Sequence, residues 1–192
     1  PNGEIKVAQT LETKGYTYTG SPPPVLELCQ NKLKVKATLE AGHLPVPKGQ
    51  LIQHPKEIEN WTLFPAIVKT AFEHCSTGLS PRSVVTSRKE LTEQVEWAHS
   101  TFHQPALVEE FIDGREFHVA IIGNETVQML PPAEMDFDQF SDLRERLCTW
   151  EAKFDPASPH YQKIQTRLPA PLSDQEKSLL EKVCLSAYRI IG

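Results

Sequence analysis

The sequence lacks the features that define several common classes of protein. No apolar run approaches the roughly 20 residues that a membrane-spanning helix needs. The 20 basic and 25 acidic side chains give a net charge of −5, and no stripe of lysine and arginine marks a nucleic-acid face. The four cysteines lie far apart in the chain, which argues against a zinc site or a disulfide framework. We therefore expect a cytoplasmic protein that binds neither nucleic acid nor membranes, with no metal ligands among its residues.

Familiar catalytic and nucleotide-binding motifs are also missing. The sequence contains neither G-x-x-x-x-G-K-[ST] nor G-x-G-x-x-G, so a P-loop and a Rossmann fingerprint are excluded. It has no G-x-S-x-G for a hydrolase elbow and no H-E-x-x-H for a zinc protease. His99 and His103 have no third ligand in view and are interpreted as a solvated helix end. His74 and Cys75 are adjacent, which makes a base–thiol pair a poor interpretation.

The pattern of apolar residues predicts a mixture of helices and strands. Helical patterns cover residues 3–15, 25–42, 88–102 and the segment after Ser173, and strand patterns cover 47–52, 64–69, 82–87 and the region near 126–130. Ser87 with Glu90, and Ser173 with Glu176, have the spacing of capping boxes. Elements in this mixed order favour α+β layers over repeated βαβ units.

Turn and linker signals divide these elements. The three prolines at 22–24 are the clearest linker. Asp113-Gly114 favours a tight hairpin between the β-rich stretches on either side, and a further turn is expected at Gly123-Asn124. The densest basic stretch, NKLKVK at 31–36, has apolar residues between its lysines and is interpreted as one helix face.

One lysine raises a chemical question. Lys69 closes the apolar run AIV at 66–68, and burying its ammonium group is costly unless an anion meets it. The following loop, HCSTG, has small residues whose N–H and hydroxyl groups could converge on an anion. Lys32 and Lys153 are further candidates for that anion. In EEFIDGRE at 109–116, carboxylates at strand ends suit ribose hydroxyls and the strand backbone suits an adenine edge. From residue chemistry alone, nucleotide binding and ordinary surface charge both stay open.

Six segments, in order along the chain, together resemble the ATP-grasp enzymes and, among them, the D-alanine–D-alanine ligases. They are PNGE with AQTLETKGYTYTGS, CQNKLKVKATLEAGHLPVP, FPAIVKTAFEHCSTGLS, LVEEFIDGREFHVAIIGN, LPPAEM and WEAKFDPASPHY. The resemblance covers nearly the whole chain. It implies an α+β ATP-grasp fold that is incomplete at both ends. Residues 1–21 would be a remnant of the N-terminal substrate domain, 22–108 the central lid subdomain, and 109–192 part of the C-terminal subdomain.

The resemblance also implies roles for individual residues. Lys69 would meet the α- and β-phosphates of ATP, with Lys32 as a second phosphate contact. The loop 73–78 would close over the γ-phosphate, and Lys153 would contact the terminal phosphate. The complete expected nucleotide-binding set is Lys32, Lys69, Glu73, Cys75, Ser76, Glu109, Glu110, Phe111, Ile112, Glu116 and Lys153. Within it, Ser76 and Lys153 are the expected catalytic residues. Glu109 would approach the adenine end, Phe111 and Ile112 would supply the hinge backbone, and Glu116 would bind the ribose hydroxyls.

The implied reaction joins two amino acids for peptidoglycan precursor synthesis. ATP phosphorylates the carboxylate of a first amino acid, D-alanine in the family, and the amine of a second attacks the acyl phosphate. Lysines and Mg²⁺ would supply positioning and charge stabilisation. The family's magnesium ligands would lie beyond Gly192, so the chain alone is expected to fold at best partly and to show no ligase turnover.

The sequence departs from the family pattern at five positions. His74 and Cys75 replace a glycine and a serine in the loop, Thr70 stands where proline is usual and Asn31 where aspartate is usual. Phe154 stands where many relatives have tyrosine. These changes are compatible with another amino or hydroxy acid as substrate. The alternatives are thus a ligase for another substrate pair and a module that binds nucleotide without ligating. A homodimer is left open as the assembly.

Overall fold

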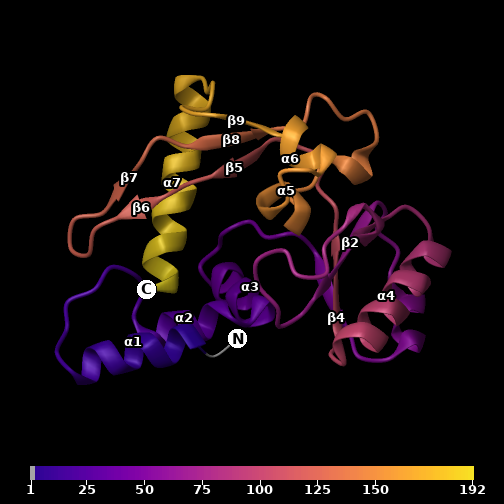
Figure 1. Cartoon of the computed structure of the whole chain (residues 1–192), viewed down its shortest axis with the longest axis horizontal. Coiled ribbons are helices and arrows are strands. Elements are labelled where there is room, and N and C mark those ends of the chain that lie inside the picture. The colour runs from indigo at the N-terminus through magenta and orange to yellow at the C-terminus, as the bar shows by residue number, and fades with distance from the viewer. Residues whose placement is uncertain (1–2) are drawn as a thin grey trace.

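The computed structural model describes residues 3–192, and its strands form two main sheets (Figure 1). Pro1 and Asn2, which begin the predicted N-terminal remnant, lie outside the described residues. The larger sheet has the order β1-β4-β2-β3 with every pair antiparallel. Its strands are β1 (Gly49–Ile52), β2 (Ala66–Thr70), β3 (Val84–Val85) and β4 (Ala106–Glu110). All three strand patterns expected between 47 and 87 are therefore confirmed.

Helix α4 (Arg88–Phe102) covers one face of this sheet (Figure 1). Leu91 and Val95 on the helix and Val68 and Val108 on the sheet are almost completely buried in one core. Every second residue of a strand points to the same face of the sheet, and an amphipathic helix carries its apolar residues on one side. Packing these two apolar surfaces together gives the single core. The short helices η1 (Pro55–Asn60) and η2 (Pro81–Ser83) complete this part of the chain.

The predicted start of α4 is confirmed, but its capping box is only half formed. The Ser87 hydroxyl accepts a hydrogen bond from the Glu90 N–H at 3.3 Å. The Glu90 carboxylate instead accepts from the Thr86 N–H at 2.7 Å. The second expected box is complete, because Ser173 and Glu176 each cap the other at the start of α7 (Asp174–Ile191).

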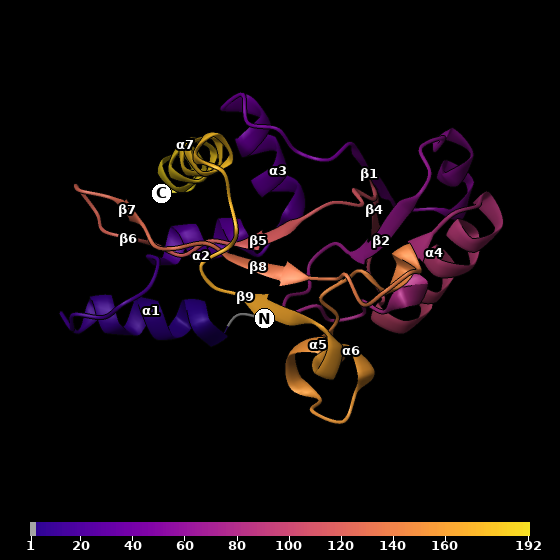
Figure 2. The ribbon, with the colours of Figure 1, turned by 90° about the horizontal axis from the view of Figure 1, so that it is seen from above.

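The smaller sheet has the order β5-β8-β9 and is followed by α7 (Figure 1). Its strands are β5 (Glu116–His118), β8 (Ala133–Asp136) and β9 (Gln165–Arg167), and β6 (Ile121–Ile122) and β7 (Gln128–Met129) form a separate ribbon. Three short helices lie between β8 and β9 in the sequence: η3 (Leu143–Glu145), α5 (Trp150–Phe154) and α6 (Pro159–Lys163). Figure 2 shows α5 and α6 on the opposite side of the strands from α3. The β6–β7 ribbon confirms the turn expected at Gly123-Asn124.

The hairpin expected at Asp113-Gly114 is wrong. β4, before this dipeptide, pairs with β1 and β2, whereas β5, after it, pairs with β8. The dipeptide is thus a crossing between two sheets. The Asp113 carboxylate accepts from the Arg146 guanidinium at 3.0 Å, which fixes the crossing without strand pairing. The domain boundary predicted between 108 and 109 falls inside β4 and stays a prediction.

The single helix expected over 25–42 is also wrong, because the chain forms α2 (Pro23–Cys29) and α3 (Lys32–Ala41) after α1 (Gly3–Thr13). Between them, the Asn31 side chain accepts hydrogen bonds from the N–H groups of Leu33 and Lys34, each at 3.1 Å. Such an Asn cap starts a new helix. Gly42 ends α3 as predicted. Among the described residues, no helix is both long enough and apolar enough to cross a membrane.

Candidate functional site

The site is centred on a buried carboxylate, Glu109, in the inner strand β4. Its two oxygens accept from different lysines: Oε1 lies 2.8 Å from Lys36 Nζ, and Oε2 lies 2.8 Å from Lys69 Nζ. The Glu109 side chain is only 8% exposed. Burial alone would raise the pKa of Glu109, but the charges and hydrogen bonds of Lys69 and Lys36 lower that pKa below its ordinary value. The carboxylate is therefore ionised and held between two amines.

Strand register explains how these groups meet. Ile67 of β2 lies opposite Glu109, so Lys69, two residues on, shares the face of Glu109 and lies diagonally beside it. Lys36 reaches this face from α3, and Gly49 of β1 leaves room for it. A Cβ atom at position 49 would lie 3.0 Å from Glu109 Cγ and 3.2 Å from Lys36 Cε, so both side chains would have to shift by a few tenths of an ångström.

A third amine, Lys32, lies near this triad. It is one helical turn before Lys36 on the same side of α3, whereas Lys34 is exposed, so the basic stretch 31–36 does not form one face as predicted. Lys32 Nζ donates a hydrogen bond to the Glu73 backbone carbonyl. Burial, and then the positive charge of Lys69, lower the pKa of Lys32. Among residues 3–192, no carboxylate lies within ion-pair distance of Lys32. Two lysine amines thus pair with Glu109, and Lys32 is influenced by the charges of Glu73 and Glu109 without an ion pair. The three ammonium groups exceed these two carboxylates by one charge, and an anion would relieve that excess.

The loop 73–78 joins Lys32 to a second group of polar atoms. Cys75 and Ser76 have φ angles of 54° and 60°, which non-glycine residues adopt rarely. The Ser76 hydroxyl donates to the Cys148 carbonyl at 2.9 Å and accepts from Lys153 Nζ at 2.8 Å. The two expected catalytic residues, Ser76 and Lys153, are therefore in direct contact. The Glu73 carboxylate accepts from Gln104 Nε2 at 3.1 Å.

The expected adenine-binding segment already uses part of its backbone. The Glu110 N–H donates to the Lys48 carbonyl, and the Phe111 N–H donates to the Pro65 carbonyl, each at 2.9 Å. The side chain of Ile112 is 66% exposed at the end of this segment. An adenine edge would therefore have to pair with carbonyl groups here, or with backbone groups from Ile112 onward.

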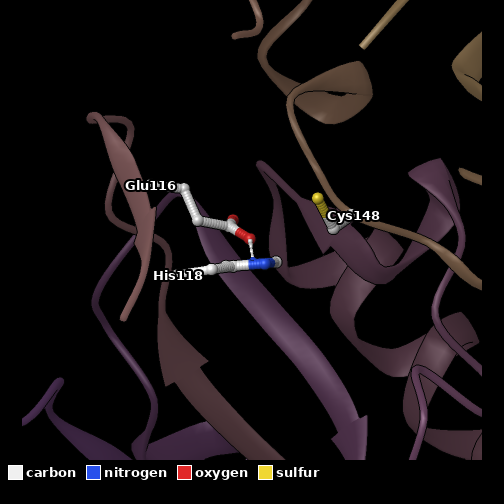
Figure 3. Close-up of side chains that lie close together, drawn as sticks. All are labelled: Glu116, His118 and Cys148. Carbon is white, nitrogen blue, oxygen red and sulfur yellow. Dashed lines mark hydrogen bonds and ion pairs between the residues drawn. The ribbon is translucent and has the colours of Figure 1, made fainter. Parts of the chain in front are cut away.

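The expected ribose contact, Glu116, lies at the start of β5 beside two residues that the sequence did not single out. Glu116 Oε1 is 3.0 Å from His118 Nε2, and the Cys148 sulfur faces both side chains (Figure 3). Burial raises the pKa of the Cys148 thiol to about 12, and the charge and hydrogen bond of Glu116 act in the same direction. The spacing of Glu116 and His118 in one strand could have predicted a shared face, but no local pattern could have placed Cys148 there.

The comparisons with known proteins agree on a family. Residues 42–192 match the family described as D-ala D-ala ligase C-terminus. The chain belongs to this family. The protein y4sG of Sinorhizobium fredii, whose function is uncharacterized, is 33% identical over 183 residues, which are 95% of this chain and 52% of that protein. A D-alanine–D-alanine ligase of Enterococcus hirae is 29% identical over 204 residues, covering 100% of this chain and 52% of the ligase.

Solved structures confirm the fold expected of the D-ala D-ala ligase family. The VanG D-Ala:D-Ser ligase of Enterococcus faecalis matches with a TM-score of 0.75 at 20% identity, over 100% of this chain and 53% of that chain. The ATP-grasp fold is therefore confirmed, together with the family resemblance. The chain spans about half the length of the curated relatives it matches. The roles expected for individual residues stay predictions.

The structure gathers six of the expected site residues into two groups, which the loop 73–78 connects. Lys32, Lys69, Glu73 and Glu109 form the first, and Ser76 with Lys153 forms the second. Sequence reasoning missed Lys36 and Gly49. The four-residue spacing between Lys32 and Lys36 is a signal for a shared helix face, whereas the role of Gly49 depends on two side chains distant in the sequence.

Proposed function

We propose that this chain forms the ATP-binding part of a carboxylate–amine ligase of the D-alanine–D-alanine type. The observation that carries the proposal is an excess of one positive charge around Glu109. Two amines are bound to that carboxylate, and a third, Lys32, donates to a neutral carbonyl with only the Glu73 carboxylate as a further negative charge acting on it. Phosphate oxygens are the natural partner for such a group, because lysine ammonium ions bind phosphate as compact point charges. Family membership supports the same ligand.

In this proposal each group of residues has a separate task. Lys32 and Lys69 hold the phosphates of ATP, and the loop 73–78 covers the transferred phosphoryl group. Ser76 and Lys153 approach that group together, so that the ammonium charge stabilises the negative oxygens as the acyl phosphate forms. The amine of the second amino acid then displaces phosphate. Mg²⁺ would supply further charge neutralisation, but Glu109 does not fit as its ligand because both of its oxygens already bind lysines.

The substrate pair could differ from two D-alanines. The solved structure most useful here is that of a D-Ala:D-Ser ligase, which makes a second acid other than D-alanine the specific alternative. Phe154, next to Lys153, is 54% exposed and is free to contact a substrate. The other candidate is a module that binds ATP without ligation. The measurement of ADP release described below distinguishes such a module from a ligase.

The first experiment measures ATP binding by isothermal titration calorimetry to the polypeptide as its gene encodes it. Wild type is compared with Lys32→Ala, Lys69→Ala and Glu116→Ala, and with Lys34→Ala as the matched control on the same helix. We expect each of the three site variants to bind ATP more weakly and the control to bind normally. Absence of ATP binding by folded wild-type protein would contradict the proposal.

The second experiment measures ADP release by the polypeptide as its gene encodes it, with Mg²⁺, ATP and a panel of D- and L-amino acids. Release stimulated by D-alanine alone would support the D-alanine–D-alanine type. Release that needs a different second acid would favour the alternative ligase. ATP binding without any amino-acid-dependent release would identify a binding module.

A further inference from the structure

Three side chains of the metal-ligating types face one another outside the lysine cluster. Glu116 and His118 project from the same side of β5, and Cys148 approaches them from the segment just before α5 (Figure 3). One ligand atom from each residue lies within 4.8 Å of the other two. The Glu116 and His118 side chains are 37% and 52% exposed, whereas Cys148 is only 6% exposed. The group therefore has a buried sulfur and an open side that solvent can reach.

The chemistry of this group suits a zinc-class ion rather than magnesium. Zinc takes sulfur, imidazole nitrogen and carboxylate oxygen at about 2.0–2.3 Å, usually in a tetrahedron. Three such ligands around one ion would lie roughly 3–4 Å apart, so the present spacing needs a contraction of only about an ångström. Thiolate and imidazole favour zinc and cobalt, whereas magnesium prefers oxygen ligands alone. The exposed side leaves the fourth position to water.

We propose that Glu116, His118 and Cys148 form a binding site for a single zinc-class divalent ion. On binding, the Cys148 S–H bond breaks, its proton passes to solvent, and the thiolate sulfur bonds to the metal. The hydrogen bond from His118 Nε2–H to Glu116 holds the two side chains side by side before the ion arrives. It breaks on binding, and the imidazole proton passes through solvent to Nδ1, so that Nε2 can bond to the metal. Sequence reasoning argued against a zinc site because no two cysteines are close in the chain. The fold provides one cysteine from a distant segment instead.

This site has a consequence for nucleotide binding that rests on the proposed function. If Glu116 binds the ribose hydroxyls, the same carboxylate cannot fully serve the ion and the nucleotide together. Bound zinc would then weaken ATP binding, and ATP would weaken zinc binding by the same factor, because coupling between two ligands is reciprocal. The lysine cluster around Glu109 contributes no ligand to the metal site.

The test uses Co²⁺ as a spectroscopic substitute for zinc, with the polypeptide as its gene encodes it kept reduced by a phosphine. A cysteine thiolate bound to Co²⁺ gives a charge-transfer band in the near ultraviolet, and displacement of that band by Zn²⁺ reports zinc binding. The variants are Cys148→Ser and His118→Ala, and the matched control is Cys184→Ser, a partly buried cysteine outside the cluster. Thermal unfolding of each variant confirms that it is folded.

We expect wild type and Cys184→Ser to bind one Co²⁺ with the thiolate band, and Zn²⁺ but not Mg²⁺ to displace it. Cys148→Ser should lose the band, and His118→Ala should bind at least about tenfold more weakly, since even outer-shell partners change affinity by that amount. A folded wild type without the band, or a band that survives Cys148→Ser, would overturn the proposed site. Cys148 is buried, so replacing it could disturb the fold. His118 is exposed, and His118→Ala therefore tests the site without that complication.

Adding ATP to the cobalt titration separates the two proposals. ATP also chelates Co²⁺ in solution through its phosphates, so each titration is expressed against the concentration of free Co²⁺. A higher dissociation constant for free Co²⁺ in the presence of ATP would support the shared use of Glu116. An unchanged value, with ATP shown to bind by calorimetry, would overturn the sharing while the metal site stands. Failure of ATP to bind at all would overturn the proposed function and leave the cobalt result unaffected.

Discussion

The four lysines of the candidate site fall into two kinds that look alike in sequence. Lys36 and Lys69 each pair with the buried carboxylate of Glu109, whereas Lys32 and Lys153 donate to uncharged oxygens of the backbone and of Ser76. Paired amines help to hold the strands and α3 together, because separating them would leave a buried charge without a partner. Amines on neutral oxygens lose little when a stronger acceptor arrives. The first pair should therefore matter most for folding, and the second pair for binding phosphate.

The largest effect is expected when the shared carboxylate is removed. Glu109→Gln leaves two partly buried ammonium groups without a counter-charge, and breaking a buried ion pair typically costs about 3–5 kcal/mol. We expect the free energy of unfolding, measured by urea denaturation, to fall by about that amount. Glu93→Gln, on the exposed side of α4, is the control and should change it by less than about 0.5 kcal/mol. A loss below about 1 kcal/mol for Glu109→Gln would show that the paired lysines are not structural.

The second test replaces a lysine of the other kind. Lys32→Ala removes an amine whose pKa is lowered by burial and by the charge of Lys69, so the free energy of unfolding should stay unchanged or rise slightly. ATP binding should weaken by roughly 10- to 100-fold, since a hydrogen bond to a charged group contributes about 1.5–3 kcal/mol. Calorimetry with ATP measures this. Lys34→Ala on the exposed side of α3 is the control and should change neither the free energy of unfolding nor ATP affinity. A clear loss of stability in Lys32→Ala would mean that Lys32 is structural, as Lys36 and Lys69 are.

Acid should lower the contribution that the ion pairs of Glu109 with Lys36 and Lys69 make to the free energy of unfolding. The pKa of Glu109 in the fold is below its ordinary value of 4.5, so Glu109 takes up a proton more readily in the unfolded chain. Its contribution to stability is thus complete above about pH 4.5 and is lost as the pH falls through the lower folded-state value. Each proton changes the free energy of unfolding by at most about 1.4 kcal/mol per pH unit.

The measurement for this prediction is urea denaturation of wild type and Glu109→Gln between neutral pH and pH 3. Glu134 also has a lowered pKa, through its hydrogen bonds with Arg115, so the variant should still lose stability in acid. The wild-type curve should nevertheless be steeper below about pH 4.5. Parallel curves for the two proteins would mean that the Glu109 carboxylate is not stabilised by Lys36 and Lys69 as the geometry indicates.

Local patterns predicted well the parts of the fold that local physics determines. The strand at 64–69, the capped starts at Ser87 and Ser173 and the helix end at Gly42 all depend on residues a few positions apart, and all are confirmed. The break at Asn31 was missed because the apolar period continues across it. The cap that starts α3 overrides that period, since one side chain satisfies two N–H groups.

The site divides in the same way. Lys69 could be singled out because a charged residue ends an apolar strand, and the family resemblance added roles that no distance here tests. The contact of Lys36 with Glu109 spans 73 positions in sequence, and the meeting of Glu116 with Cys148 depends on how β5 and the segment before α5 pack. The crossing at Asp113-Gly114 was misread for the same reason. A tight turn and a passage between sheets need the same residues, and only strand pairing distinguishes them.

The smallest effect concerns Ser76, which lies between Lys153 and the Cys148 carbonyl. Ser76→Ala removes two hydrogen bonds at a partly exposed position, so the free energy of unfolding should fall by no more than about 1–1.5 kcal/mol. Lys153 keeps its charge, and ATP affinity should therefore change less than in Lys153→Ala, which removes the charge itself. Ser100→Ala on the exposed surface of α4 is the matched serine control. Equal weakening of ATP binding by Ser76→Ala and Lys153→Ala would contradict this prediction. It would mean that the Ser76 hydroxyl is needed to position Lys153, so that Lys153 does not simply exchange a neutral oxygen for phosphate.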